Sequence, residues 1–362
     1  MSLMKKDNKE LLVIVQYPEH VSPGQRFRVE LYKDLLLRNG FRITTRPFLD
    51  KHGYDIIHKY GFFFTKSIAI LKGFLSRLLL IFSIKKYDFI FLQREATPIG
   101  PPVFEWVIVK LLRRKVIYDF DDAIWINLVS EQNRLATLLK NTGKVSSICR
   151  WAYKVSCGNR YLCDYALQYN SNVVYNPTCV DVLYKHNIAA KQDVDKITIG
   201  WTGSFSTVVY LDIVKPALKR LQEKYDFNIK IICNREPSLG LKNVKYVQWT
   251  EDNEVLELSS CQIGLMPLNY DEWANGKCGF KIIQYFALEI PAVSSPVGVN
   301  KTIIEEGVNG YFANSDMEWY TAIERLLLNA DLRKTLGKAG RKKVVEQFSL
   351  QSNETNFLAL FQ

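Results

Sequence analysis

The residues best suited to binding a charged ligand lie in the C-terminal half of the chain, where a loop with Gly276 and Gly279 leads into a helix predicted at about 277–288. The N-terminus of a helix presents unpaired N–H groups and the positive end of the helix dipole, which together favour an anion. Lys277 and Lys281 are four residues apart, so they are expected to share one face of this helix and to add positive charge. The pattern predicts a binding site for a diphosphate.

A second glycine turn is predicted to hold part of the same ligand. Gly203, Ser204 and Phe205 follow a predicted strand at 197–201 and lead into a helix, so their backbone N–H groups can bind phosphate oxygens. A lone glycine turn is weak evidence, and this one is not a Walker loop. Arg235, which follows the next predicted strand, is expected to lie near the base of a nucleotide.

Three carboxylates directly follow another predicted strand. Asp119, Asp121 and Asp122 lie within four residues, and such groups repel one another unless a cation, a hydrogen-bond donor or water compensates them. Apolar residues on both sides place this acidic loop at a buried sheet edge. A divalent cation is one way to compensate the carboxylates, and a purely structural turn is the plain alternative.

Three further loops at the ends of predicted strands carry side chains that can bind a ligand. Gly24 allows close backbone approach, and Arg26 and Arg28 can hold an acidic group; the alternative is a solvated loop that begins a helix. Arg94 either contacts a ligand or pairs with a neighbouring glutamate or the acidic loop. Asn159 either contacts a ligand or caps the helix that follows it.

Predicted strands and helices alternate along the chain, which indicates a parallel sheet in each half. The predicted strands are 11–16, 41–46, 88–93, 116–120, 153–157 and 172–175 in the first half, and 197–201, 228–232, 244–247, 262–266 and 292–294 in the second. At 362 residues the chain exceeds the usual size of a single core, so two domains are expected. We predict an α/β protein with one domain at 1–180, a second at 190–348, and a final helix at 349–362 that packs back on the first.

The second half contains the runs IGLMPL, GKCGFKIIQYFALEIPAV, SSPVGV and EEGVNGYFA. These resemble the donor-binding half of glycosyltransferase family 4 (group 1), whose members have the GT-B architecture, two Rossmann-like domains facing a cleft. The resemblance implies transfer of a sugar, with retained anomeric configuration, from a nucleoside-diphosphate sugar to a glycan or lipid-linked acceptor in polysaccharide or glycolipid synthesis. It implies neither a metal nor a cofactor besides the donor substrate.

The resemblance also implies roles for single residues. A family histidine that contacts the transferred sugar aligns with Asp121, so a carboxylate here is expected to bind sugar hydroxyls or to stabilise an oxocarbenium-like transition state, with Asp119 and Asp122 beside it. The expected donor-binding residues are Gly203, Ser204, Phe205, Arg235, Lys277, Gly279, Lys281 and Gln284. The expected acceptor-binding residues are Gly24, Arg26, Arg28, Arg94 and Asn159.

The chain departs from the family pattern in the donor half. Gly276 and Gln284 stand where the family has two glutamates, and the amide of Gln284 can still hydrogen-bond a ribose hydroxyl. The family's arginine and lysine after the glycine turn are also missing, so Lys277 and Lys281 are expected to supply that charge. Two other functions therefore stay open: a non-catalytic GT-B protein that binds a sugar or nucleotide, and a sugar-nucleotide epimerase on the same fold.

Charge and composition limit the classes of partner that the protein is expected to bind. With 48 basic and 37 acidic residues the chain has a formal charge of +11, which favours phosphate groups, anionic lipid or nucleic acid. Nucleic acid is the weakest of these because the basic residues are dispersed and no nucleic-acid module is recognisable. Seven cysteines without a CxxC pair, together with no leader pattern, favour the cytoplasm.

The segment 62–84 is rich in aromatic and aliphatic residues. No run reaches about 18 uncharged apolar residues, the length that a membrane span needs. The segment is either a helix packed in the core of the first domain or a basic, apolar surface that rests on the inner face of an anionic membrane.

Overall fold

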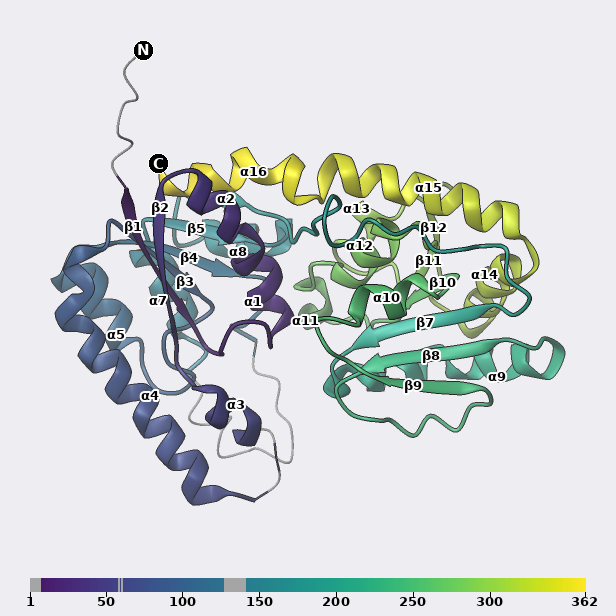
Figure 1. Cartoon of the computed structure of the whole chain (residues 1–362), viewed down its shortest axis with the longest axis horizontal. Helices are drawn as coiled ribbons and strands as arrows, with labels where there is room; N and C mark the ends of the chain where they lie inside the picture. Colours follow the sequence, from purple (N-terminus) through teal and green to yellow (C-terminus); the bar gives the residue numbers. More distant parts are fainter. Residues whose placement is uncertain (1–7, 58, 60, 127–140) are drawn as a thin grey trace, which may run out of the picture. The chain divides into compact units, whose positions relative to one another are not determined.

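The computed structural model describes residues 8–57, 59, 61–126 and 141–362, which form two compact units (Figure 1). Unit 1 comprises Met1–Thr178 and Glu354–Gln362, and unit 2 comprises Cys179–Asn353. The chain thus leaves unit 1 close to the predicted end of the first domain and returns to it near its C-terminus.

Unit 1 is built on a parallel sheet with the strand order β2-β1-β3-β4-β5-β6. The strands are β1 (Lys9–Val15), β2 (Phe41–Pro47), β3 (Phe89–Gln93), β4 (Lys115–Phe120), β5 (Lys154–Cys157) and β6 (Val173–Tyr175). The described helices are α1 (Pro23–Arg28), η1 (Glu30–Tyr32), α2 (Lys33–Arg38), α3 (Lys51–Ile57), α4 (Phe63–Ser83), η2 (Ile84–Lys86), α5 (Val103–Trp106), η3 (Val107–Leu111), α7 (Lys144–Trp151) and α8 (Arg160–Leu167). β3 is apolar and buried along most of its length, as expected for a central parallel strand covered on both faces.

Unit 2 repeats this plan with the strand order β12-β11-β10-β7-β8-β9. The strands are β7 (Thr198–Gly203), β8 (Asn228–Cys233), β9 (Val244–Gln248), β10 (Ile263–Met266), β11 (Ala292–Ser294) and β12 (Gly310–Phe312). The described helices are η5 (Phe205–Ile213), α9 (Lys215–Lys224), α10 (Glu254–Ser259), α11 (Glu272–Asn275), α12 (Phe280–Ala287), α13 (Asn300–Ile303), α14 (Asp316–Leu328) and α15 (Ala330–Gln347). The sequence pattern did not predict β12, which is only three residues long.

Both sheets have a point where the strand order reverses. In unit 1 the chain continues from β1 to β2 on one side and then returns to place β3 on the other; in unit 2 β7 has β8 on one side and β10 on the other. Ligands of open parallel sheets bind beyond the carboxyl ends of the strands at such a reversal. The loops after β1 and β3, and those after β7 and β10, are therefore where each unit is expected to bind.

The end of the chain packs into unit 1, where α16 (Leu350–Leu358) is followed by η6 (Ala359–Phe361). The ring of Phe357 stacks on Tyr32 with centroids 3.7 Å apart, and Phe361 lies 5.1 Å from Phe41. Lys154 Nζ donates to the carbonyl of Ala359 at 2.6 Å. These contacts hold the last residues against η1, β2 and β5 of unit 1, where the final helix was predicted to pack.

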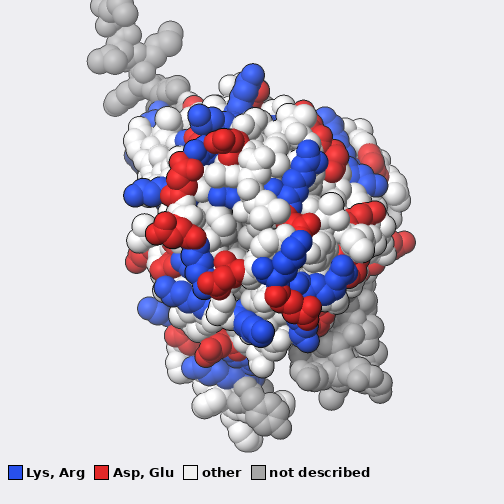
Figure 2. Space-filling view, turned by 90° about the vertical axis from the view of Figure 1, so that its right-hand side faces the viewer, with Lys and Arg blue, Asp and Glu red and all other residues white. Residues whose placement is uncertain are grey.

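The surface charge of unit 2 is mixed. Figure 2 shows Lys and Arg side chains scattered among Asp and Glu over the face that it displays. Many of these charges form ion pairs, for example Arg220 with Asp316 at 2.6 Å and Lys224 with Glu324 at 3.0 Å. On this face, therefore, the net positive charge is not gathered into one patch.

Candidate active site

The carboxyl end of β7 in unit 2 carries the second glycine turn. A Cβ on Gly203 would lie 2.7 Å from Cη2 of Trp201 and 2.8 Å from Oγ1 of Thr207, so only glycine fits between them. Ser204 then precedes η5, and its carbonyl accepts from the hydroxyl of Thr207 at 2.9 Å. The turn is thus tightly packed on one side, and this fixes its backbone at the strand end where a ligand is expected.

Residues after β8 join this turn. Oδ1 of Asn234 accepts from the backbone N–H of Phe205 at 2.7 Å, which ties the two strand ends together. The guanidinium of Arg235 lies over the Phe205 ring, 3.4 Å from its centroid. An aromatic ring with a stacked arginine is a flat cationic platform of the size of a nucleobase.

The helix predicted at about 277–288 begins later than expected. α12 starts at Phe280, with Gly279 before it in the left-handed region at φ 66°, where a Cβ would also lie 2.2 Å from Cδ1 of Ile303. Lys277 therefore precedes the helix, and the prediction that Lys277 and Lys281 share one helix face is wrong. The physical reason is Gly279, whose positive φ interrupts the helical run.

The two lysines contact different aromatic rings. Lys277 Nζ lies 4.7 Å from the ring centroid of Trp273, whereas Lys281 Nζ lies 5.5 Å from that of Trp201. Because Trp201 also packs against Gly203, its buried indole links Lys281 to the second glycine turn. The structure thus links Lys281 to that turn through Trp201, whereas Lys277 lies over the ring of Trp273.

Arg235 and Lys281 both influence the pKa of the Cys233 thiol. Burial raises the pKa of Cys233, at the end of β8, while backbone N–H groups and the charges of Arg235 and Lys281 lower it. Arg235 and Lys281 therefore both lie within electrostatic range of the same strand end. With the N-terminus of α12, they make the carboxyl edge of β7 and β8 electropositive, which suits an anionic ligand.

Gln284 is held by a buried carboxylate from another helix, a contact that the sequence did not predict. It is almost fully buried in α12, and its Nε2 donates to Oε1 of Glu254 at 2.9 Å. Glu254 is the first residue of α10 and is 3% exposed. A carboxylate is therefore present next to position 284, although another helix supplies it. Glu254 ends the loop that follows the predicted strand 244–247, and this strand-end position is its signal in the sequence.

In unit 1, Arg28 and Asp119 form a closed pair that is 0% exposed. Arg28 Nε donates to Asp119 Oδ2 at 3.1 Å and Nη2 to Oδ1, while Nη1 donates to the carbonyl of Asn176. The hydroxyl of Ser156 donates to Asp119 Oδ1 at 2.6 Å. Direct contact with a substrate, predicted for Arg28 and Asp119, does not fit this arrangement, because each is already satisfied by the other in the interior. The Arg28–Asp119 pair instead supports the acidic loop from the interior.

Arg94, at the end of β3, holds the other two aspartates. Its Nε and Nη2 donate to Asp121 Oδ1 at 3.1 and 3.0 Å, and Nη2 also pairs with Asp122. Burial lowers the pKa of Arg94, but the charges of Asp121 and Asp122 raise it further, so the arginine stays charged. The alternative in which Arg94 pairs with the acidic loop is therefore correct.

Gly24 faces the same carboxylate. A Cβ at Gly24 would lie 2.8 Å from Oδ2 of Asp121, so the first turn of α1 approaches the acidic loop only because this residue has no side chain. The side chain of Asp121 is 13% exposed. The structure thus brings together three predicted residues, Gly24, Arg94 and Asp121, at the reversal point of the unit 1 sheet.

Two further candidates have local roles. Asn159 caps α8, since its Oδ1 accepts from the N–H of Leu162 at 2.8 Å, which is the helix-capping alternative. The guanidinium of Arg26 is buried and lies 4.9 Å from the ring centroid of Phe27. Neither placement presents the residue to an acceptor as predicted.

The described residues hold no group of three or more His, Cys, Asp or Glu side chains that could bind a metal ion. The aspartates of the acidic loop are instead paired with arginines. Hydrogen-bond donors therefore compensate the repulsion between these carboxylates.

Comparison with known proteins now places unit 2 in a family. Residues 196–329, which include both glycine loops, match the family described as Glycosyl transferases group 1. Unit 2 contains a group 1 glycosyltransferase domain. Comparison with curated protein sequences gives no significant match.

Solved structures match the whole chain. Sucrose-phosphate synthase from Thermosynechococcus elongatus is 15% identical and has a TM-score of 0.71 over 98% of each chain. A glycosyltransferase from Rickettsia africae ESF-5 is 15% identical, with a TM-score of 0.69 over 98% of each chain. HepE from Anabaena in complex with UDP-glucose is 13% identical, with a TM-score of 0.70 over 98% of this chain and 99% of that one. At such identities the likeness shows the fold, and that fold is GT-B.

Proposed function

We propose that the protein is a retaining glycosyltransferase that moves a sugar from a nucleoside-diphosphate sugar to a glycan or lipid-linked acceptor in polysaccharide or glycolipid synthesis. The observation that carries the proposal is the electropositive edge of the group 1 domain. There, Lys281, Arg235 and the N-terminus of α12 surround the turn at Gly203. A diphosphate is the ligand that needs several positive donors within one short edge.

Each part of the donor has a matching part of unit 2. The N–H groups at Gly203 and Ser204, the start of α12 and the ammonium of Lys281 are assigned to the diphosphate. Gln284, whose amide nitrogen is held by the buried Glu254, is assigned to the ribose hydroxyls through its amide oxygen. The Phe205–Arg235 platform is assigned to the base. UDP-glucose bound to HepE, a GT-B relative, supports a nucleotide sugar as the donor.

Unit 1 is assigned the reacting sugar and the acceptor. Asp121 has one oxygen on Arg94 and the other beside Gly24, so its position is fixed while part of it stays exposed. A fixed carboxylate at the anomeric carbon stabilises the positive charge that develops as the glycosidic bond breaks. We assign no metal or cofactor to this step. The seven cysteines are all buried and form no disulfide with one another, and we propose a cytoplasmic location.

The test has a binding arm and a turnover arm. Thermal unfolding is measured with UDP, GDP and ADP and with the matching nucleosides, and only one diphosphate is expected to raise Tm strongly. The purified protein is then incubated with sugars of that nucleotide, with and without lipid extract, and free nucleotide is measured. Acceptor-dependent release, with the anomeric configuration of the product read by NMR, supports the proposal. No stabilisation by any diphosphate would overturn it.

The non-catalytic alternative keeps one specific observation in its favour. The family glutamate at position 284 is a glutamine whose amide is already engaged with Glu254. In this alternative the same diphosphate stabilises the protein, but no acceptor releases free nucleotide. An epimerase differs again, since it alters the sugar of the donor in the absence of an acceptor. The turnover arm separates all three functions once the sugar of the donor recovered without acceptor is also analysed, because only an epimerase changes it.

A further inference from the structure

Helix α4 of unit 1 turns its large apolar residues outward. Its buried positions are Ala69, Gly73, Arg77 and Leu80, at intervals of three or four residues. Gly73 lets the helix approach the ring of Phe48, because a Cβ there would lie 2.6 Å from that ring. The exposed large residues of the helix are Phe63, Phe64, Ile68, Leu71, Phe74, Leu75, Leu78, Leu79 and Phe82, and the last is 83% exposed. Burial in unit 1 therefore does not account for the apolar character of α4.

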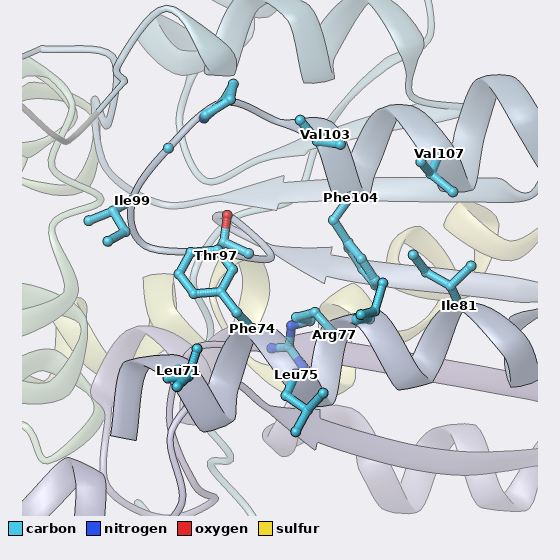
Figure 3. A pocket seen from close by; sticks show the side chains of 13 residues that line it. Leu71, Phe74, Leu75, Arg77, Ile81, Thr97, Ile99, Val103, Phe104 and Val107 are labelled. Carbon is cyan, nitrogen blue, oxygen red and sulfur yellow. The ribbon is translucent and has the colours of Figure 1, made fainter. Parts of the chain in front are cut away.

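The outward residues of α4 form one wall of a cavity of about 470 Å³ (Figure 3). Leu71, Phe74, Leu75, Leu78 and Ile81 line it from α4. The opposite wall comes from the segment 97–107, with Ile99, Val103, Phe104 and Val107. Below, we call this cavity with the exposed side of α4 the α4 face. The cavity is large enough for several methylene groups of a hydrocarbon chain.

The single charged residue in the cavity wall is turned away from any ligand. Arg77 donates from Nε to the carbonyl of Ala96 at 2.9 Å, from Nη2 to Val15 at 2.8 Å and from Nη1 to Pro47 at 3.3 Å. Burial lowers its pKa to about 10, so it remains charged at neutral pH, with backbone carbonyls around it. Arg77 therefore anchors α4 to the carboxyl ends of β1 and β2, and the cavity offers its ligand an apolar lining.

The exposed charges of the segments that form the α4 face have one sign, because Glu105 of α5 is buried. Between residues 56 and 87 and again between 106 and 118 the chain contains Lys and Arg but neither Asp nor Glu. The exposed members are Lys59, Lys72, Lys85, Lys86, Lys110, Arg113 and Lys115. On the face of unit 2 in Figure 2 the two signs alternate. An apolar face whose segments expose cations and no carboxylate is complementary to an anionic lipid surface.

We propose that the α4 face docks on an anionic lipid bilayer and that the cavity between α4 and α5 takes up one hydrocarbon chain of a lipid. By length and composition, Phe63–Lys86 is the one helix of the described residues that could also cross a membrane. The Arg77 anchor and the Gly73–Phe48 contact instead keep its other side on the sheet of unit 1. The proposal does not depend on sugar transfer, and its tests need no activity.

Vesicle flotation tests the docking. The full-length protein should float with phosphatidylglycerol vesicles at low salt, much less at high salt, and not with phosphatidylcholine vesicles. Replacing Lys72, Lys85 and Lys86 by Ser should weaken partitioning by about fivefold for each cation, the equivalent of ~1 kcal/mol near such a surface. The matched controls are Lys338→Ser on α15 and Leu167→Ser on α8, both exposed, which should float like the wild type. Equal binding to both vesicle types, or to neither, would overturn the proposal.

A lysolipid with a single chain tests the cavity. Myristoyl lysophosphatidylglycerol, kept below its micelle concentration, should bind once per chain in native mass spectrometry. Leu78→Glu, inside the cavity, should lower this binding at least tenfold, whereas Phe82→Glu, exposed but outside the cavity, should leave it unchanged and weaken only flotation. Equal loss in both variants would overturn the assignment of the cavity.

A native tryptophan reports how the face is oriented. Trp106 is 46% exposed and directly precedes Val107 of the cavity wall. Phospholipids brominated on the acyl chain should quench part of the fluorescence, and Trp106→Phe should remove that part. If Trp106 is not quenched while gel filtration shows a dimer that Leu75→Glu dissolves, the α4 face joins two copies of the chain and the proposal fails.

Discussion

The candidate sites of the two units place their cations on different partners. In unit 2, Lys281 and Arg235 rest on the rings of Trp201 and Phe205. In unit 1, Arg28 and Arg94 rest on the carboxylates of the acidic loop. Leaving a ring costs a cation about 0.5–2 kcal/mol, whereas breaking a buried ion pair costs about 3–5 kcal/mol.

This difference indicates how the two regions work. A cation on a ring, such as Arg235 on Phe205, can turn toward an incoming anion, so the edge of unit 2 is suited to bind and release a charged ligand. The paired charges of unit 1 cannot move cheaply, so the acidic loop is suited to hold one geometry. Preorganisation of that kind is what electrostatic catalysis requires. Four substitutions test the comparison, in order of decreasing effect.

Breaking the Arg28–Asp119 pair should have the largest effect, and it should appear in stability. Arg28→Ala leaves the Asp119 carboxylate in the interior with only Ser156 to compensate it, so the free energy of unfolding should fall by roughly 3–5 kcal/mol. Urea unfolding followed by circular dichroism measures this. The exposed pair Arg220–Asp316 is the control, because Arg220→Ala should cost less than about 1 kcal/mol. An equal loss of unfolding free energy in the two variants would mean that the Arg28–Asp119 pair does not stabilise unit 1 more than a surface ion pair does.

Asp121→Asn should act on turnover rather than on folding. The amide keeps the shape of the side chain, and Arg94 keeps Asp122 as a partner, so the variant should fold. The loss of a fixed charge at the reacting sugar should raise the barrier by roughly 2–4 kcal/mol, or about 30- to 900-fold in kcat. Steady-state kinetics measures kcat, and calorimetry should show that the donor Kd changes far less. Wild-type kcat in a folded variant would leave Asp121 without a catalytic role.

The parts that sequence could predict are those set by local pattern. Alternating apolar runs and helical segments located nearly all strands, and the strand ends located the turn at Gly203 and the acidic loop. Parallel sheets gather such ends at one edge, so the meeting of Arg94 with Asp121 also follows from topology.

The parts that sequence could not predict depend on contacts between distant positions. Arg28 and Asp119 are 91 residues apart, and nothing in either loop shows that they satisfy each other in the interior. Glu254 reaches Gln284 from a different helix, 30 residues away. The sequence contained only a weak indication that the large apolar residues of α4 point outward. Sequence patterns assume that large apolar residues are the buried ones, but the buried positions of α4 include small residues and one arginine.

Lys281→Ala should weaken the binding of the nucleoside diphosphate by roughly ten- to a hundredfold, because a charge-assisted hydrogen bond contributes about 1.5–3 kcal/mol. Binding of the bare nucleoside should be nearly unchanged, since the ammonium of Lys281 is assigned to the diphosphate and the Phe205 platform to the base. Calorimetric titration of both ligands measures this. Lys277→Ala is the informative control, because the structure places that lysine on Trp273 and before α12. An equal loss of diphosphate affinity in the two variants would mean that Lys281 has no special role at the turn around Gly203.

Restoring the family glutamate should give the smallest effect, and an instructive one. Gln284→Glu would put a second carboxylate where the amide now donates to Glu254 at 2.9 Å. Two carboxylates at that distance raise the pKa of one of them, and the lost hydrogen bond costs about 1–3 kcal/mol. Because the raised pKa belongs to the folded state, the deficit in unfolding free energy should be full at neutral pH and should shrink as pH falls through that pKa.

The double variant Gln284→Glu/Glu254→Gln separates charge from position. It returns one carboxylate and one amide to the site with their places exchanged, so the stability lost in the single variant should return to within about 1 kcal/mol of the wild type. If the pair serves the ribose, the double variant should also bind the nucleoside diphosphate about as well as the wild type, as calorimetry can measure. Stability without affinity would assign Glu254 and Gln284 to the interior of unit 2 alone. The ribose contact would then have to come from other residues of that edge.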